Sequence, residues 1–174
     1  MHKIFSRQFN SNQTHQGFTL VELVFYLAIA AIMILSISNL FGVISEMRLR
    51  NQVALTVEEE GRHALNYILQ TVRNSSSVAN PSPNNIGASL SLNIAGVANV
   101  FDLYTNRLRL TEGASQSIFL TSDKLIVSNL TFQNLANSST KDNIRVQFEL
   151  RYLNSASRSS YNYGKIFIGT AQRR

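Results

Sequence analysis

Residues 17–36 read GFTLVELVFYLAIAAIMILS, and the organisation of the whole chain follows from this segment. Leu23–Leu35 is an unbroken run of thirteen apolar residues, and no charged residue occurs between Glu22 and Glu46. At about 1.5 Å per residue, a helix over residues 18–45 is about 42 Å long, whereas a bilayer core needs roughly 20 apolar residues. The segment therefore predicts a helix that crosses a membrane once.

Helical periodicity continues beyond the apolar segment. Residues 46–73 contain no proline and a single glycine, Gly61, and their apolar side chains recur at helical spacing. The predicted apolar face consists of Met47, Ala54, Val57, Gly61, Ala64, Leu65, Ile68 and Val72. We expect one continuous helix from Phe18 to about Arg73, apolar all round in its first half and amphipathic in its second.

The period of the pattern changes after the helix. Residues 74–85 contain both prolines of the chain among Asn and Ser, which predicts a helix end and a loop. Further on, apolar and polar residues alternate, as in half-buried antiparallel strands. The predicted strands are centred on residues 107–110, 117–121, 124–127, 130–135, 145–152 and 165–170. Short turns are expected at residues 105–106 and 122–123, and exposed loops at residues 136–143 and 154–162.

An amphipathic helix and a one-sided sheet bury their apolar faces against each other. The predicted fold class is therefore α+β, with a long N-terminal helix packed on a C-terminal antiparallel sheet of six or seven short strands.

Composition excludes several classes of function. The chain of 174 residues has no cysteine, so disulfides, thiolate catalysis and cysteine-ligated metals are excluded. Its three histidines are scattered along the sequence, and we expect no metal and no cofactor. No catalytic motif based on serine, histidine or a phosphate-binding loop is present, so we predict that the chain is not an enzyme.

A short motif lies where a polar, basic leader meets the apolar segment. Gly17-Phe18-Thr19-Leu20-Val21-Glu22 resembles the cleavage and methylation site of type IV pilins and type II secretion pseudopilins. The resemblance implies that a prepilin peptidase cuts after Gly17 on the cytoplasmic face and methylates the new N-terminus at Phe18. It also implies assembly with other pilin or pseudopilin subunits through the N-terminal helix, in which Glu22 takes part.

The resemblance divides the chain into four parts. These are a leader (residues 1–17), a transmembrane and assembly half of the helix (18–45), an amphipathic half (46–73) and a head domain (74–174). It implies a single-pass inner-membrane protein with an extracytoplasmic head, which then enters a cell-surface or periplasmic filament. A membrane segment without proline and the absence of a cysteine pair favour a minor pilin or minor pseudopilin over an abundant one.

Glu22 has a physical interpretation that does not depend on the family. A carboxylate in the membrane costs about 2.5–3.5 kcal/mol at the bilayer centre and less near its edge, so it needs a partner. Cleavage after Gly17 creates an ammonium group at Phe18, which Glu22 can pair with on a neighbouring chain or on its own chain. Alternatively, Thr19 and Glu22 form only a capping box, as in many soluble helices.

Charge suggests further alternatives. The formal net charge is +6, and residues 74–174 carry ten basic and five acidic side chains. Arg107 and Arg109, and separately Arg145 and Arg151, lie on the polar faces of predicted strands and could contact DNA phosphates, as in pilin-like proteins of DNA-uptake machines. Residues 58–60 are all glutamate and are interpreted as a solvated helix face. The other class of function is an uncleaved, signal-anchored extracytoplasmic binding protein.

Overall fold

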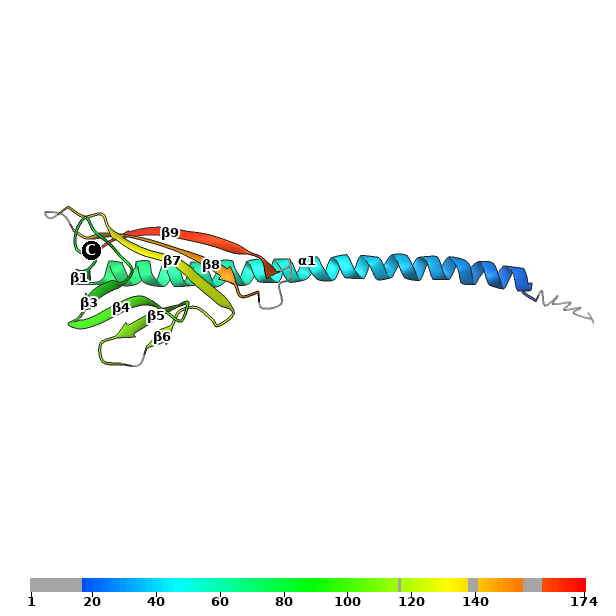
Figure 1. Cartoon of the computed structure of the whole chain (residues 1–174), viewed down its shortest axis with the longest axis horizontal. Helices are drawn as coiled ribbons and strands as arrows, with labels where there is room; N and C mark the ends of the chain where they lie inside the picture. The colour runs from blue at the N-terminus through cyan, green and yellow to red at the C-terminus, as the bar shows by residue number, and fades with distance from the viewer. Residues whose placement is uncertain (1–16, 116, 138–140, 155–160) are drawn as a thin grey trace, which may run out of the picture. The chain divides into compact units, whose positions relative to one another are not determined.

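The computed structural model describes residues 17–115, 117–137, 141–154 and 161–174, and within them the chain forms one long helix followed by β-strands (Figure 1). The elements are α1 (Leu20–Asn74), β1 (Ser77–Asn80), β2 (Ile86–Gly87), β3 (Leu90–Ile94), β4 (Val97–Tyr104), β5 (Arg107–Glu112), β6 (Ile118–Phe119), β7 (Leu125–Asn134), β8 (Asn143–Tyr152) and β9 (Gly164–Gln172). All pairings between strands are antiparallel. The predicted α+β class is confirmed.

The described residues fall into two compact units, an N-terminal unit that ends at Val43 and a C-terminal unit that comprises Ile44–Arg174. In the N-terminal unit, every large apolar side chain is at least half exposed. Among the described helices, α1 is the one with a window long and apolar enough to cross a membrane, and none of that window is buried in the protein. This segment therefore has the composition of a membrane anchor.

The part of α1 within the C-terminal unit buries one face. The buried residues are Val53, Val57, Gly61, Ala64, Ile68, Leu69 and Val72. Most of the predicted apolar face is thus confirmed, but Met47 is exposed, and Ala54 and Leu65 are only partly buried. Met47 precedes the buried part of α1, which begins at Val53, and periodicity alone does not show where burial begins.

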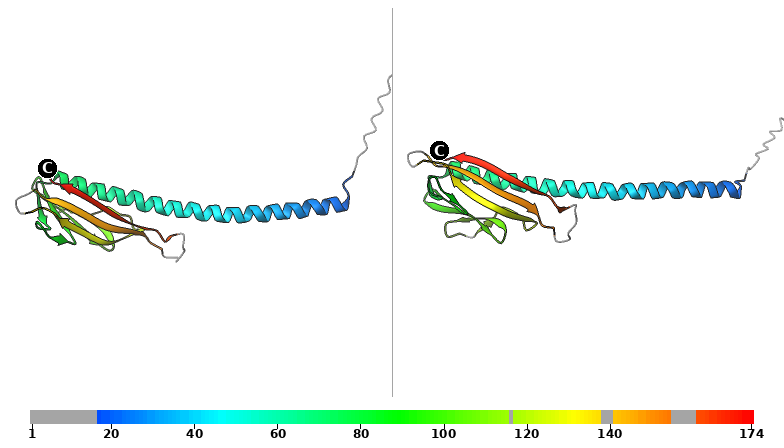
Figure 2. Two further views of the ribbon diagram at one scale, coloured as in Figure 1. Left: turned by 90° about the horizontal axis from the view of Figure 1, so that it is seen from above. Right: turned by 45° about the horizontal axis from the view of Figure 1, so that its top comes forward.

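The strands form two sheets instead of the single predicted one. Their orders are β1-β3-β4-β5-β6 and β2-β7-β8-β9, and Figures 1 and 2 show the two layers beside the C-terminal part of α1. The two sheets adjoin where the amide of Val127 on β7 donates to the carbonyl of Asn106, which follows β4. One apolar core, which includes residues of α1 and of both sheets, fills the space between them.

Strands β1 to β4 were not expected from the alternation pattern. In β4, the buried positions are Asn99 and Phe101, so a polar residue occupies the inner face and hides the period of two. β1 lies within residues 74–85, which were predicted to be a loop. It is four residues long and its register shifts between Val78 and Asn80, so its pairing depends on β3 more than on its own sequence.

Two predicted strands, at residues 124–127 and 130–135, are one continuous strand, β7. Its register with β8 shifts between Ser128 and Thr131, where Asn129 has a φ of 52°. Such a bulge inserts an extra residue and breaks the alternation without ending the strand. The turn at residues 105–106 is confirmed, and both residues have a positive φ, as a tight hairpin requires. The predicted loops at 136–143 and 154–162 lie partly outside the described residues.

Candidate processing and assembly site

Thr19 sets the start of α1. Its side-chain oxygen Oγ1 accepts a hydrogen bond from the amide of Glu22 at 3.3 Å, and its carbonyl accepts one from the amide of Leu23 at 3.2 Å. Thr19 is therefore the N-cap, and the helix begins at Leu20, two residues after Phe18. Residues 1–16 of the predicted leader lie outside the described part of the chain.

The Glu22 carboxylate points toward the C-terminal end of the helix. Its Oε1 accepts a hydrogen bond from the Tyr26 hydroxyl at 3.3 Å, and the rings of Tyr26 and Phe18 meet edge to face with centroids 6.3 Å apart. The capping side chain thus comes from Thr19, while the carboxylate contacts a neighbour one turn later. Sequence reasoning missed Tyr26, although its spacing of four residues from Glu22 is the signal for such a contact.

This arrangement keeps the carboxylate close to the predicted cleavage bond. Phe18 lies outside the helix and is 75% exposed, so the Gly17–Phe18 bond precedes the first helical residue and its surroundings are open. Among the described residues, no basic side chain pairs with Glu22, and one hydrogen bond from a neutral tyrosine hydroxyl does not compensate its negative charge. The site can therefore accept a cation, and cleavage after Gly17 would produce one at Phe18.

The two arginines on β5 are already engaged within the protein. Arg107 donates from Nε and Nη2 to the carbonyl of Thr121, at 3.0 and 2.9 Å, and its guanidinium lies 3.9 Å from the centre of the Phe119 ring. Arg109 donates to both carboxylate oxygens of Asp102, at 2.9 and 2.6 Å. That hydrogen bonding raises the pKa of Arg109 above its ordinary value. The ion pair with Asp102 offsets the charge of Arg109, and the bonds to Thr121 occupy N–H donors of Arg107 that an anionic partner would use.

Arg145 and Arg151 lie on β8, which belongs to the other sheet. Arg151 donates from Nε to Glu149 at 2.6 Å, and this bond lowers the pKa of the Glu149 carboxyl. The structure thus places the four predicted DNA contacts on two separate sheets, and three of the four interact with neighbouring groups of the protein. DNA binding stays a prediction.

The acidic run at residues 58–60 joins α1 to the strands. Glu58 accepts hydrogen bonds from Lys165 at 2.8 Å and from the Tyr163 hydroxyl at 3.2 Å, which together lower its pKa. Glu60 accepts the amide of Ser122 at 2.8 Å, and Glu59 is exposed. The interpretation as a solvated face is wrong for Glu58 and Glu60, because consecutive helical residues face different neighbours. Among the described residues, no group of three or more acidic or histidine side chains could hold a metal ion.

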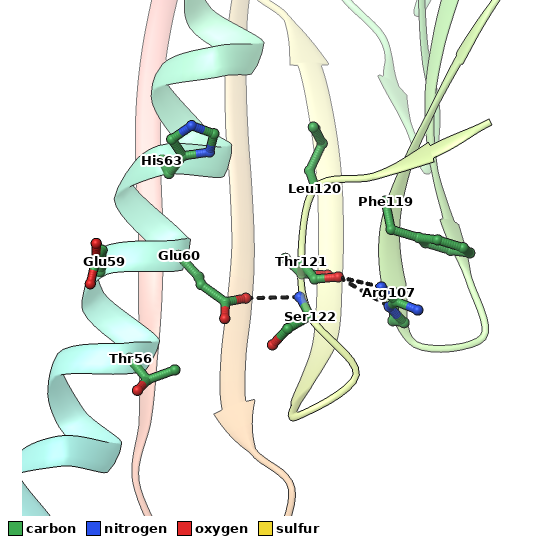
Figure 3. Close-up of a pocket in the computed structure, with 9 residues that line it drawn as sticks. All are labelled: Thr56, Glu59, Glu60, His63, Arg107, Phe119, Leu120, Thr121 and Ser122. Atoms are coloured by element: carbon green, nitrogen blue, oxygen red, sulfur yellow. Dashed lines mark hydrogen bonds between the residues drawn. The ribbon is translucent and has the colours of Figure 1, made fainter. Parts of the chain in front are cut away.

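Glu60 also borders an open pocket of about 520 Å³ between α1 and the segment that follows β6 (Figure 3). Glu60 bonds to the backbone of Ser122 across it, and Arg107 bonds to the neighbouring Thr121. The remaining lining residues are Thr56, Glu59, His63, Phe119 and Leu120. Glu60 and Arg107 bond to the backbone of the segment 120–122 from its two sides and hold it in place, which is a structural task.

Comparison with known families finds one match. Residues 12–38 match the prokaryotic N-terminal methylation motif, the signature of type IV pilins and pseudopilins. The match includes Gly17, Phe18, Thr19 and Glu22, so the resemblance seen in the sequence is confirmed. Comparison with curated proteins and with solved structures gave no match. The motif is that of structural proteins processed at their N-terminus.

Proposed function

We propose that this chain is a structural subunit, in the role of a minor pilin or minor pseudopilin, of a type IV pilus or a type II secretion-like filament. Prepilin peptidase removes residues 1–17 and the new N-terminus is methylated at Phe18. The observation that supports this best is that the methylation motif, the start of α1 and the exposed apolar segment occur together in the chain. The matched motif spans residues 12–38, and within it Gly17 lies three residues before the capped start of α1 and just before an apolar segment whose large side chains are exposed in the described part of the chain.

The assembly step follows from the charge of Glu22. After cleavage, Phe18 carries an ammonium group, and Glu22 of one subunit neutralises the ammonium of its neighbour. Both groups then leave water together, which is far less costly than burying either alone. Pairing across subunits also fixes the axial offset between adjacent helices, because the two charges must come within contact distance.

The exposed apolar side chains of the N-terminal unit have two successive environments in this proposal. They contact lipid while the subunit is anchored, and other helices once it enters the filament. Because lipid chains are as apolar as leucine, helix association here depends on close packing and on polar contacts such as that of Glu22. An exposed apolar helix is therefore compatible with both states.

The proposed location follows from the same segment. The chain is anchored by one span in the inner membrane, with the C-terminal unit outside the cytoplasm, and afterwards forms part of a periplasmic or cell-surface filament. The minor role is supported by two features of the sequence, the absence of proline from residues 18–45 and the absence of cysteine.

Intact mass spectrometry of the native protein tests the proposal. We expect the chain from wild-type cells to begin at Phe18 and to carry one methyl group, and the chain from cells without prepilin peptidase to begin at Met1. The filament fraction should contain only the shorter form. A chain that keeps residues 1–17 in cells with active peptidase would instead support the uncleaved, signal-anchored binding protein.

A further inference from the structure

The two sheets have four edge strands, and one of them differs from the others. β2 and β6 are two residues long, and β1 has four residues and an interrupted register. β9 has nine residues, and its pairing with β8 is regular from Gly164 to Gln172. Among the strands that the structure describes, β9 is thus the only long and uninterrupted edge.

An open edge presents unpaired backbone N–H and C=O groups, and natural proteins protect such edges with short strands, bulges, prolines or charged side chains. β9 (GKIFIGTAQ) has no proline and no bulge. Its single charged residue, Lys165, bonds to Glu58 on α1 and so does not guard the edge. The protective devices seen on the other three edges are missing here.

The side chains of β9 differ between its two faces. On the inner face, Phe167 is buried and stacks on Phe148 with ring centroids 5.5 Å apart, while Gly169 lies against Leu65 and Leu69. On the outer face, Ile166 and Ile168 are 56% and 58% exposed. Packing on the inner face therefore keeps the strand ordered, which reduces the conformational entropy lost when a partner binds. The outer face offers two exposed β-branched apolar side chains to that partner.

We propose that β9 is a docking edge to which an extended segment of a different filament subunit adds as a further strand. The added strand would take its affinity from main-chain hydrogen bonds, and its specificity from apolar side chains that meet Ile166 and Ile168. This inference rests on the proposed function, because it takes the partner to be another component of the same filament.

A second copy of this chain fits the edge less well. Pairing β9 with β9 is a two-fold contact that is complete after two copies, so it cannot be repeated along a helical filament. The other described edges have two to four residues and cannot match nine. The partner strand is therefore expected from a different chain.

The first test uses the full chain with a photoreactive residue in place of Ile168, in cells that produce all filament subunits. The matched control places the same residue at Ile86, a 66% exposed isoleucine on the opposite edge strand of the same sheet. We expect a cross-link from position 168 to an extended segment of another filament subunit, mapped by peptide mass spectrometry, and none from position 86. A cross-link to a second copy, or equal cross-linking at both positions, would overturn the proposal.

The second test compares hydrogen exchange of the wild-type chain, isolated in detergent and assembled in filaments. We expect the amides of β9 to slow by about tenfold or more on assembly, since their outward N–H groups gain partners, while those of β1 do not change. Unchanged β9 amides in filaments that contain the methylated chain would overturn this inference and leave the proposed function intact. Absence of the processed chain from the filaments would instead contradict the proposed function.

Discussion

The two parts of α1 have the same backbone conformation but opposite relations to the rest of the chain. From Leu20 to Val43 the large apolar side chains are at least half exposed, whereas from Val53 to Val72 one face is buried against the sheets. The described residues of the chain thus leave the first part uncovered, whereas they supply the core that covers the second. Substitutions in the first part are expected to change anchoring and assembly, and those in the second part to change folding.

A matched pair of phenylalanines tests this contrast with the largest expected effect. Phe148→Ala removes a fully buried ring of the core and should lower the free energy of unfolding by about 3–5 kcal/mol. Phe25→Ala, at a 65% exposed position of the N-terminal unit, should leave it unchanged. Urea denaturation of the full chain in detergent, followed by tyrosine fluorescence, measures both. Equal losses for the two variants would remove the distinction between the two parts of the helix.

The two glycines of α1 provide a second pair. A methyl group at Gly61 would overlap the Phe167 ring, so Gly61→Ala should lower the free energy of unfolding by about 1–3 kcal/mol. At Gly42 an added methyl group meets no atom within 4 Å, and Gly42→Ala should only strengthen the helix, by about 0.5–1 kcal/mol. Thermal unfolding and helix content by circular dichroism distinguish the two. A stabilising Gly61→Ala would mean that β9 does not lie this close to α1.

A substitution at Glu22 tests the opposite case, in which assembly is impaired and the stability of the C-terminal unit is not. If Glu22 pairs with the Phe18 ammonium as proposed, Glu22→Ala removes that partner and should lower incorporation into filaments by about tenfold or more, which corresponds to at least about 1.4 kcal/mol. The unfolding midpoint of the C-terminal unit should stay unchanged. The control is Glu59→Ala, at an exposed position of the same helix, which should incorporate normally. Quantitative immunoblotting of sheared filaments measures both, and normal incorporation of Glu22→Ala would refute the assembly role.

The smallest effect concerns pH. Hydrogen bonds from Lys165 and Tyr163 lower the pKa of Glu58 below its ordinary value of 4.5. A carboxyl with a lowered pKa stabilises the folded state fully above its unfolded pKa, and this contribution is lost as the pH falls through the folded value. Between about pH 5 and 3, Glu58→Gln should therefore lose less stability than the wild type. Identical acid profiles in urea titrations would show that this contact adds no stability.

The methylation motif and the start of the helix beside it could be predicted from the sequence, because their features are local. Gly17, Phe18, Thr19 and Glu22 are contiguous with the apolar run, and the N-cap at Thr19 depends only on residues within one turn. The hydrogen bond from Tyr26 to Glu22 could also have been predicted from the sequence, since residues four apart are neighbours on any helix.

The role of the acidic run was not predictable in this way. Glu58 and Glu60 bond to residues that lie 107 and 62 positions further along the chain, and no local pattern indicates such partners. The same holds for Arg107 and Arg109. Their alternation with leucines predicts a strand, which β5 confirms, but their bonds to Thr121 and Asp102 depend on neighbouring segments.

The sequence by itself determined the helix, its apolar and amphipathic parts and the motif at its start, because each depends on residues close together in the chain. Only the tertiary structure decided that the strands divide into two sheets, that Asn99 faces inward and that β9 forms an open edge. Sheet membership is decided by backbone pairing between distant segments, and the energy of that pairing is nearly the same for many alternative partners. The packing of the shared core selects among these alternative pairings, and local sequence patterns do not reveal that packing.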